Sequence, residues 1–127
     1  MRILLVDDNA LVRRAIRDVL RPEKTWEICD EASNGSQAFE KVRALRPDVI
    51  LLDKSMPGGN GFETARRIRQ ENSEVKILML SQEDACRMLS AAIESGADGC
   101  VDKSRIVSDL IPAVKKCAPD DPHPIVT

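Results

Sequence analysis

One short stretch of the chain sets strong limits on the fold. The run Val49–Leu52 is wholly apolar, it ends at Asp53, and Pro57 and three glycines follow within a few residues. A run of this kind, bounded by turn residues, is typical of a strand buried on both faces, as in a parallel sheet. Because proline and glycine do not continue such a strand, we expect it to end near Asp53.

Apolar runs alternate along the chain with apolar residues at helical spacing. The runs predict strands at Arg2–Val6, Asp48–Leu52, Val75–Leu80 and Asp98–Val101. Glu27–Glu31 is predicted as a weaker strand, because Ile28 and Asp30 alternate less cleanly. The segments that follow them predict five helices, with Pro22, Pro47 and Gly96 as stop signals. Five such pairs with short connections predict a flavodoxin-like α/β fold: a five-stranded parallel sheet in the order 2-1-3-4-5, with helices on both faces.

The C-terminal part of the chain contains one local conflict. Leu110, Ile111 and Val114 have helical spacing, but Pro112 lacks the N–H that an interior helix position needs. A helix that begins near Ser108 would place the proline in or just after its first turn. Residues 118–127 have no periodicity, so we expect a domain over residues 1–117 and a tail or linker over 118–127.

Composition excludes several classes of protein. The 127 residues suffice for one domain, and the formal net charge of −2 argues against direct nucleic-acid binding. No apolar stretch is long enough for a membrane span, and no signal peptide is evident, so a cytoplasmic location is expected. The four cysteines lack metal-ligand spacing and are expected to be free thiols. The single histidine, His123, lies in the tail, which excludes histidine-based catalysis.

Several polar residues stand where the predicted strands end. Asp7 and Asp8 end the first run, Asp53 the third, Ser81 the fourth and Lys103 the fifth. The carboxyl ends of parallel strands meet at one edge of the sheet, and ligands bind there at the switch point, which lies between the first and third strands. The sequence therefore predicts a site at this edge.

The chemistry of this site follows from its three carboxylates. Acids brought together repel one another unless a cation joins them, and oxygen ligands of this kind suit Mg²⁺. A carboxylate beside a metal can attack a phosphoryl group and form an acyl phosphate. Lys103 and the Ser81 hydroxyl would then supply a cation and a donor for the phosphoryl oxygens. Taken singly, Asp7 is also a candidate cap for the first helix, a role for which Asn9 competes.

The chain resembles the receiver domains of bacterial two-component response regulators over residues 1–117. The resemblance rests on Val6–Asn9, Leu52–Gly61, Ser81 and the segment from Gly96 to Lys103. It implies a CheY-like fold, Mg²⁺ as cofactor, and phosphoryl transfer to Asp53 from a sensor histidine kinase or a phosphotransfer protein. Such a domain catalyses only its own phosphorylation and dephosphorylation.

The same resemblance implies roles for individual residues. Asp8 and Asp53 would bind Mg²⁺ directly, as would the main-chain carbonyl of Ser55, and Asp7 would act through water. Ser81 would turn onto the phosphoryl group, and Lys103 would pair with it. The residues implied to tune the lifetime of the acyl phosphate are Ser55, Gln82 and Glu83.

The resemblance also implies an output. The segments Asn9–Arg13 and Gly96–Gly99 are most similar to the subfamily that carries a LuxR-type helix-turn-helix DNA-binding domain, which would lie outside these residues. Phosphorylation would switch the surface of the fourth helix, fifth strand and fifth helix, and the partners implied include a second copy of the chain in a phosphorylation-dependent homodimer. Two positions depart from the family: Cys100 replaces the usual aromatic switch residue, and Gln82 replaces a small residue.

Three other classes of protein share part of this pattern. An aspartyl phosphohydrolase needs a second acid two residues after the nucleophile, where Ser55 stands, and a flavodoxin needs a phosphate loop and stacking aromatics that the chain lacks. A pseudo-receiver would keep the fold and bind proteins without phosphorylation. Cys100 and Gln82 favour this last alternative, whereas the full set of acidic residues favours phosphorylation.

Overall fold

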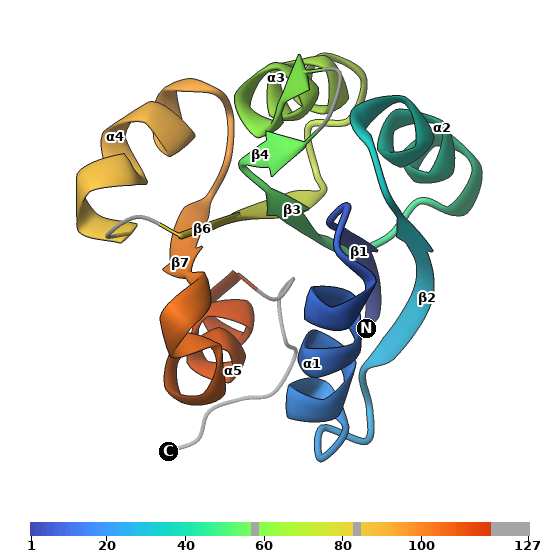
Figure 1. Ribbon diagram of the computed structural model, residues 1–127. Coiled ribbons are helices and arrows are strands. Elements are labelled where there is room, and N and C mark those ends of the chain that lie inside the picture. Colours follow the sequence, from blue (N-terminus) through green and yellow to red (C-terminus); the bar gives the residue numbers. More distant parts are fainter. Residues whose placement is uncertain (57–58, 83–84, 118–127) are drawn as a thin grey trace, which may run out of the picture.

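The protein is built around a central parallel sheet (Figure 1). The structure is a computed structural model that describes residues 1–56, 59–82 and 85–117, without the side chains of residues 85–88. The strands of this sheet are β1 (Arg2–Val6), β2 (Glu27–Ala32), β3 (Val49–Asp53), β6 (Lys76–Ser81) and β7 (Gly99–Asp102). They pair in parallel in the order β2-β1-β3-β6-β7. This confirms the predicted order, because β6 and β7 are the fourth and fifth strands of the sheet along the chain.

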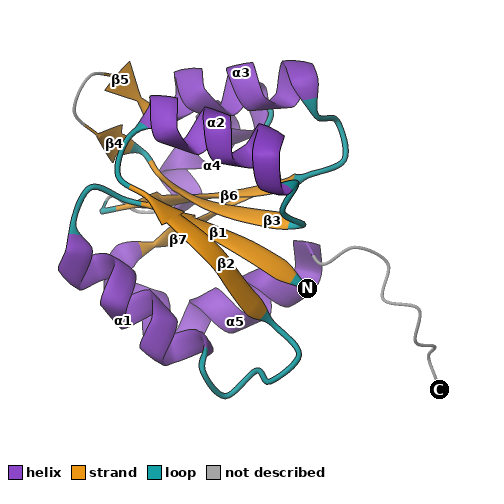
Figure 2. Ribbon diagram, turned by 90° about the vertical axis from the view of Figure 1, so that its right-hand side faces the viewer, coloured by secondary structure: helices purple, strands orange, loops and turns teal. Residues whose placement is uncertain are grey.

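Helices cover both faces of the sheet, as predicted. The helices are α1 (Ala10–Leu20), α2 (Gly35–Leu45), α3 (Gly61–Glu71), α4 (Ala85–Glu94) and α5 (Ile106–Cys117). Figures 1 and 2 show α1 and α5 on one face and α2, α3 and α4 on the other. Each layer encloses its own apolar core. None of these helices, within the described part of the chain, is long and apolar enough to cross a bilayer.

Burial on both faces explains why β3 lies at the centre. Ile50 and Leu52 point into the core beneath α2 and α3, whereas Val49 and Leu51 point into the core beneath α1 and α5. These four side chains are fully buried. Successive side chains of a strand face opposite sides, so a strand between two helical layers must be apolar throughout.

Side-chain caps fix where the helices begin. The Asn9 side chain accepts hydrogen bonds from the main-chain N–H groups of Leu11 and Val12, at 2.8 and 3.4 Å. Asn9 therefore fills the cap position of α1 for which Asp7 was also a candidate, and the Asp7 carboxylate is available elsewhere. At the far end of α4, Gly96 has a φ of +99°, which confirms it as a helix stop.

The prediction that the last helix begins near Ser108 is wrong. A 3₁₀ turn, η1 (Lys103–Arg105), leads directly into α5 at Ile106, and Pro112 lies inside the helix. Pro112 and Ser108 are both exposed, so the Ser108 carbonyl, which loses its usual N–H partner, faces solvent. Burial of a regular stripe on the opposite side stabilises the helix across the proline; the stripe consists of Ile106, Leu110, Val114 and Cys117.

A short ribbon follows β3 that the sequence did not predict. Strands β4 (Ser55–Met56) and β5 (Gly59–Asn60) pair antiparallel and lead into α3 at Gly61. The Gly61 N–H donates to the Lys54 carbonyl at 2.7 Å. A Cβ at position 61 would overlap the Asp53 carbonyl oxygen and lie 2.9 Å from the Lys54 Cα. Glycine is therefore required where α3 passes over the end of β3.

Gly61→Ala is expected to lower the free energy of unfolding by about 2 kcal/mol, because the methyl group meets backbone atoms that cannot move aside. Urea unfolding measures this loss. Gly99→Ala is a matched control, since its Cβ would meet the mobile end of the Leu78 side chain at 3.0 Å, and a smaller effect is expected. Equal losses at both positions would contradict the argument.

Candidate functional site

The predicted site residues converge at the carboxyl edge of the sheet. Asp53 ends β3, Ser81 ends β6, and Asp7 follows β1 directly, while Lys103 opens η1 after β7. Strands β1 and β3 are neighbours in the sheet, and their connections leave in opposite directions, so this edge is the switch point of the fold (Figure 1). A cavity of about 290 Å³ opens there; its lining includes Asp7, Asp8, Asn9, Asp53, Ser55, Ser81, Gln82 and Lys103.

Three carboxylates form a tight cluster in this cavity. One oxygen from each of Asp7, Asp8 and Asp53 lies within 4.8 Å of the other two. Asp7 and Asp53 are buried, at 0% and 3% exposure, whereas Asp8 is exposed. Main-chain donors orient the buried pair: the Asn9 N–H donates to Asp7 Oδ1 at 2.9 Å, and the Ser55 N–H donates to Asp53 Oδ1 at 3.2 Å. The cluster is thus held open toward solvent on the Asp8 side.

Lys103 joins the two buried acids. Its Nζ lies 2.8 Å from Asp7 Oδ2 and 3.0 Å from Asp53 Oδ1. Burial by itself lowers the pKa of Lys103, but the contacts with Asp7 and Asp53 outweigh it and raise that pKa above its ordinary value. Lys103 is therefore a fixed cation at neutral pH, positioned beside the Asp53 carboxylate.

The pKa of Asp53 is also raised, but here burial is the dominant cause. Burial raises the pKa of Asp53 above the ordinary 3.8, against the lowering effects of Lys103 and the Ser55 N–H, and the nearby Asp7 charge raises it further. The folded protein therefore holds the Asp53 proton more tightly than the unfolded chain does. Ionisation of Asp53 consequently disfavours the folded state, and stability falls as the pH rises from 3.8 through the raised pKa.

Asp53→Asn is expected to stabilise the metal-free protein at pH 7, because the amide removes the cost of a buried charge and leaves Lys103 paired with Asp7. The gain should shrink as the pH is lowered, since Asp53 of the wild type then becomes protonated. Denaturant unfolding between pH 4 and pH 8 measures both effects. A gain that is independent of pH would rule out charge burial as its cause.

The donor set fits a hard divalent cation. Lys103 pairs with two of the three carboxylates, those of Asp7 and Asp53, and the third belongs to the exposed Asp8. Among the described residues, no donor reaches the fully buried Asp7 Oδ2 with hydrogen-bond geometry, although Lys103 lies at ion-pair distance. Carboxylate oxygens with one solvent-facing side suit Mg²⁺, which keeps several of its waters. Asp7, Asp8 and Asp53 are therefore the residues that could hold such an ion.

The remaining predicted residues lie around this centre. Ser81 is buried at 2% exposure, and Gln82 and Ser55 are exposed at the cavity mouth. Glu83 lies outside the described residues. Cys100 is half-buried in β7 and packs against the core beneath α3 and α4, and it does not line the cavity. Burial raises the pKa of the Cys100 thiol, so this cysteine is a packing residue at neutral pH.

The cysteines that the structure describes are free, as expected. Cys29, Cys100 and Cys117 form no disulfide, and the side chain of Cys86 is outside the described part. Burial raises the pKa of Cys117 to about 11, which keeps its thiol protonated.

One residue near the site was missed by the sequence analysis. Arg13 Nη1 donates to the Asp7 carbonyl at 2.6 Å, and its Nε donates to Glu31 Oε1 at 2.7 Å. Arg13 thereby ties α1 and the end of β2 to the backbone of the acidic cluster. Its position in the sequence could have indicated this role, because the first turns of α1 and the end of β2 both lie at the carboxyl edge of the sheet.

The fold and the site together define a doubly wound α/β protein with a lysine-bridged acidic cluster at its switch point. The response regulator receiver domain family matches residues 3–115. The chain belongs to this family.

Individual relatives agree with this assignment. The chain is 34% identical over 116 residues to the nitrate/nitrite response regulator protein NarL of Escherichia coli strain K12, covering 91% of this chain and 54% of that protein. Among solved structures, a LuxR-family two-component response regulator from Aurantimonas sp. SI85-9A1 superposes with a TM-score of 0.85 at 31% identity, covering 91% of this chain and 82% of that one. The response regulator domain of Thermotoga maritima CheB gives 0.84 at 26%, covering 96% and 98%. The chain spans about half the length of NarL.

Proposed function

We propose that Asp53 accepts a phosphoryl group from the phosphohistidine of a sensor kinase or phosphotransfer protein, with Mg²⁺ as cofactor. The observation that carries the proposal is the buried Asp53 carboxylate held between Lys103 and the acids Asp7 and Asp8 in a solvent-open cavity. Membership of the receiver family supports it. In this reading the protein is the receiver part of a two-component system, and its catalysis is limited to its own phosphorylation and dephosphorylation.

The contacts of Asp53 favour one of its oxygens as the nucleophile. Oδ1 is held by Lys103 Nζ and by the Ser55 N–H, which leaves Oδ2 as the oxygen for attack. Oδ2 forms the new bond to phosphorus while the P–N bond of the donor breaks, and the departing imidazole nitrogen keeps the electron pair. Such transfer depends on positioning and charge neutralisation more than on proton transfer, which fits a site without histidine.

The remaining residues have supporting roles in this proposal. Asp8, Asp53 and the Ser55 carbonyl would hold Mg²⁺ directly, and Asp7 would hold it through water. When bound, the ion would neutralise charge on the phosphoryl oxygens. Lys103 would pair with a phosphoryl oxygen as a second cation. To do so, its Nζ must leave its present contacts with Asp7 and Asp53. Gln82 and Ser55, at the cavity mouth, would set how readily water reaches the acyl phosphate.

The output would run through the surface of α4, β7 and α5. Ser81 ends β6 beside β7 in the sheet, so a rotation of its hydroxyl toward the phosphoryl group would act on the segment that leads to α4. Cys100 has no ring to follow this movement, so a small rearrangement is proposed. The receiver of a LuxR-type regulator would pass the change to a DNA-binding domain or to a second copy of the receiver.

Incubation with acetyl phosphate and Mg²⁺ tests the proposal. Intact mass should show one phosphoryl adduct on the wild type, and peptide mapping should locate it at Asp53. Asp53→Asn should abolish the adduct, whereas the control Asp30→Asn, at an exposed position of β2, should retain it. No adduct on the wild type would favour the phosphorylation-independent pseudo-receiver, and an equal yield on Asp53→Asn would show that another residue is the acceptor.

A further inference from the structure

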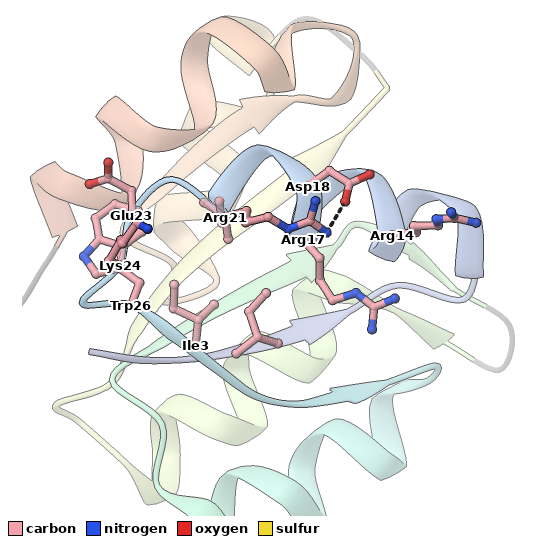
Figure 3. Close-up of a pocket in the computed structure, with 10 residues that line it drawn as sticks. Ile3, Arg14, Arg17, Asp18, Arg21, Glu23, Lys24 and Trp26 are labelled. Atoms are coloured by element: carbon pink, nitrogen blue, oxygen red, sulfur yellow. Dashed lines mark hydrogen bonds and ion pairs between the residues drawn. The ribbon is translucent and has the colours of Figure 1, made fainter.

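A second cavity lies away from the acidic cluster, between α1 and the edge of the sheet. This groove has a volume of about 700 Å³. Its floor is apolar, formed by Ile3, Leu20, Trp26 and Ile28, and its rim carries four basic residues, Arg14, Arg17, Arg21 and Lys24, and two acidic ones, Asp18 and Glu23. We call these ten residues the α1–β2 groove. Figure 3 shows Trp26 and Lys24 at one end, Arg14 at the other and Ile3 between them.

The charges of the groove are only partly neutralised within the protein. Arg21 pairs with Asp18 at 2.6 Å, and Arg17 pairs with Glu31 at 2.5 Å. Arg14 and Lys24 are exposed and make no ion pair with any residue in the described part of the chain. The groove thus presents an apolar floor between two unpaired cations, in a chain whose net charge is −2. Its chemistry suits an acidic segment that also carries apolar side chains.

The chain contains such a segment immediately after α5. Residues 118–127 read Ala-Pro-Asp-Asp-Pro-His-Pro-Ile-Val-Thr, with two acids, Asp120 and Asp121, followed by the apolar pair Ile125 and Val126. The three prolines reduce the conformational freedom of the free segment, so ordering it costs less entropy than ordering an average sequence. Proline-rich segments also dock readily against aromatic side chains, and Trp26 is the one tryptophan of the chain.

The end of α5 brings this segment to the rim of the groove. Lys115 Nζ lies 3.7 Å from Glu23 Oε1, and Glu23 precedes Lys24 at the Trp26 end of the groove. Asp120 and Asp121 follow Cys117 by three and four residues, which places them within about 13 Å of the helix end even when extended. Ten residues reach about 33 Å, and α1 is about 16 Å long. The segment can therefore run the length of the groove.

We propose that residues 118–127 dock in the α1–β2 groove of the same chain. Asp120 and Asp121 pair with Lys24 and Arg21 at the Trp26 end, and Ile125 and Val126 cover the apolar floor. The groove is thus an intramolecular docking surface for the segment that follows the receiver domain, and docking fixes the direction in which the chain leaves it. The proposal does not depend on phosphorylation of Asp53.

Trp26 provides a direct readout because it is the chain's single tryptophan and lines the groove. The experiment measures acrylamide quenching of Trp26 fluorescence in the 127-residue protein. Asp120→Asn with Asp121→Asn in the tail, and Arg21→Gln with Lys24→Gln in the groove, are each expected to raise the quenching constant about twofold. Arg66→Gln, at an exposed position of α3 on the other face of the sheet, is the matched control and should leave quenching unchanged.

The pairs of substitutions also form a double-mutant cycle. If the acids of the tail meet the cations of the groove, the combined variant should quench no more than either pair alone, because both remove the same contacts. Additive effects, or tail substitutions without effect on Trp26, would overturn the proposal. A dilution series separates a second copy from the same chain: docking in cis is independent of protein concentration, and an effect that disappears on dilution would overturn it in favour of exchange between copies.

Discussion

Lys103→Met is expected to lower the free energy of unfolding by about 3 kcal/mol at pH 7 without divalent cations. The substitution keeps a long unbranched side chain but removes the cation that lies 2.8 Å from Asp7 Oδ2 and 3.0 Å from Asp53 Oδ1. Both carboxylates are buried, at 0% and 3% exposure, so they are left facing each other without the counter-ion that Lys103 supplies. Removal of one partner of a buried charge group is costly because the other charges stay buried.

The pH dependence of this loss identifies its cause. The wild-type Lys103 has a raised pKa, so its contribution is fully present below the ordinary value of 10.5 and is lost as the pH rises through the raised value. In the variant, protonation of the carboxylates at acidic pH relieves their repulsion, so the difference between the two proteins should shrink as the pH falls. Urea unfolding at pH 7 and at pH 4 measures this change.

Two further variants sharpen the comparison. Lys116→Met makes the same chemical change at an exposed position of α5 and should cost little. Adding Asp53→Asn to Lys103→Met removes one of the two buried carboxylates that lack a counter-ion, so part of the lost free energy of unfolding should return. A loss in Lys103→Met that is the same at both pH values, and that Asp53→Asn does not reduce, would mean that packing of the lysine stem matters more than its charge.

The convergence of these polar residues at one edge was predictable, because the sheet itself brings them together. Asp7, Asp53, Ser81 and Lys103 all end or follow apolar runs, and parallel strands place such ends at one edge. The strands extend slightly beyond their apolar runs, because Asp53 still pairs with Leu80 in the sheet. Backbone pairing does not require an apolar side chain, so hydrophobicity marks the core of a strand better than its last residue.

Other features depend on contacts that a linear pattern does not contain. The weak alternation of β2 reflects an irregularity in register: Ile3 pairs with Ile28 and Leu4 pairs with Asp30, which leaves Cys29 between them. In the same way, Leu11 fits the apolar spacing of α1 but is 74% exposed, because the helix packs a different set of apolar side chains against the sheet: Val12, Ile16, Val19 and Leu20. Spacing shows which residues share a helix face, and packing decides which of them are covered.

Mg²⁺ is expected to raise the thermal stability of the wild type and to leave Asp8→Ala nearly unaffected. A ligand that binds the folded state stabilises it by RT ln(1 + [L]/Kd), so Mg²⁺ at ten times its Kd contributes about 1.4 kcal/mol, or about 5 °C in Tm for a domain of this size. Asp8 is the exposed member of the cluster, and its carboxylate lies within 4.8 Å of those of Asp7 and Asp53. Without it the remaining acids are those already bridged by Lys103, which leaves little excess charge for a divalent ion.

Without Mg²⁺, Asp8→Ala should not be less stable than the wild type. Asp8→Ala removes one of three mutually repelling carboxylates, so the variant should be at least as stable as the wild type before Mg²⁺ is added. Differential scanning fluorimetry at constant ionic strength, with Mg²⁺ titrated against NaCl, measures both effects. Asp30→Ala, at an exposed position outside the cluster, is the control and should keep the wild-type response. An undiminished metal-dependent shift in Asp8→Ala would place the ion elsewhere, since the only described acidic cluster able to bind it would then be incomplete.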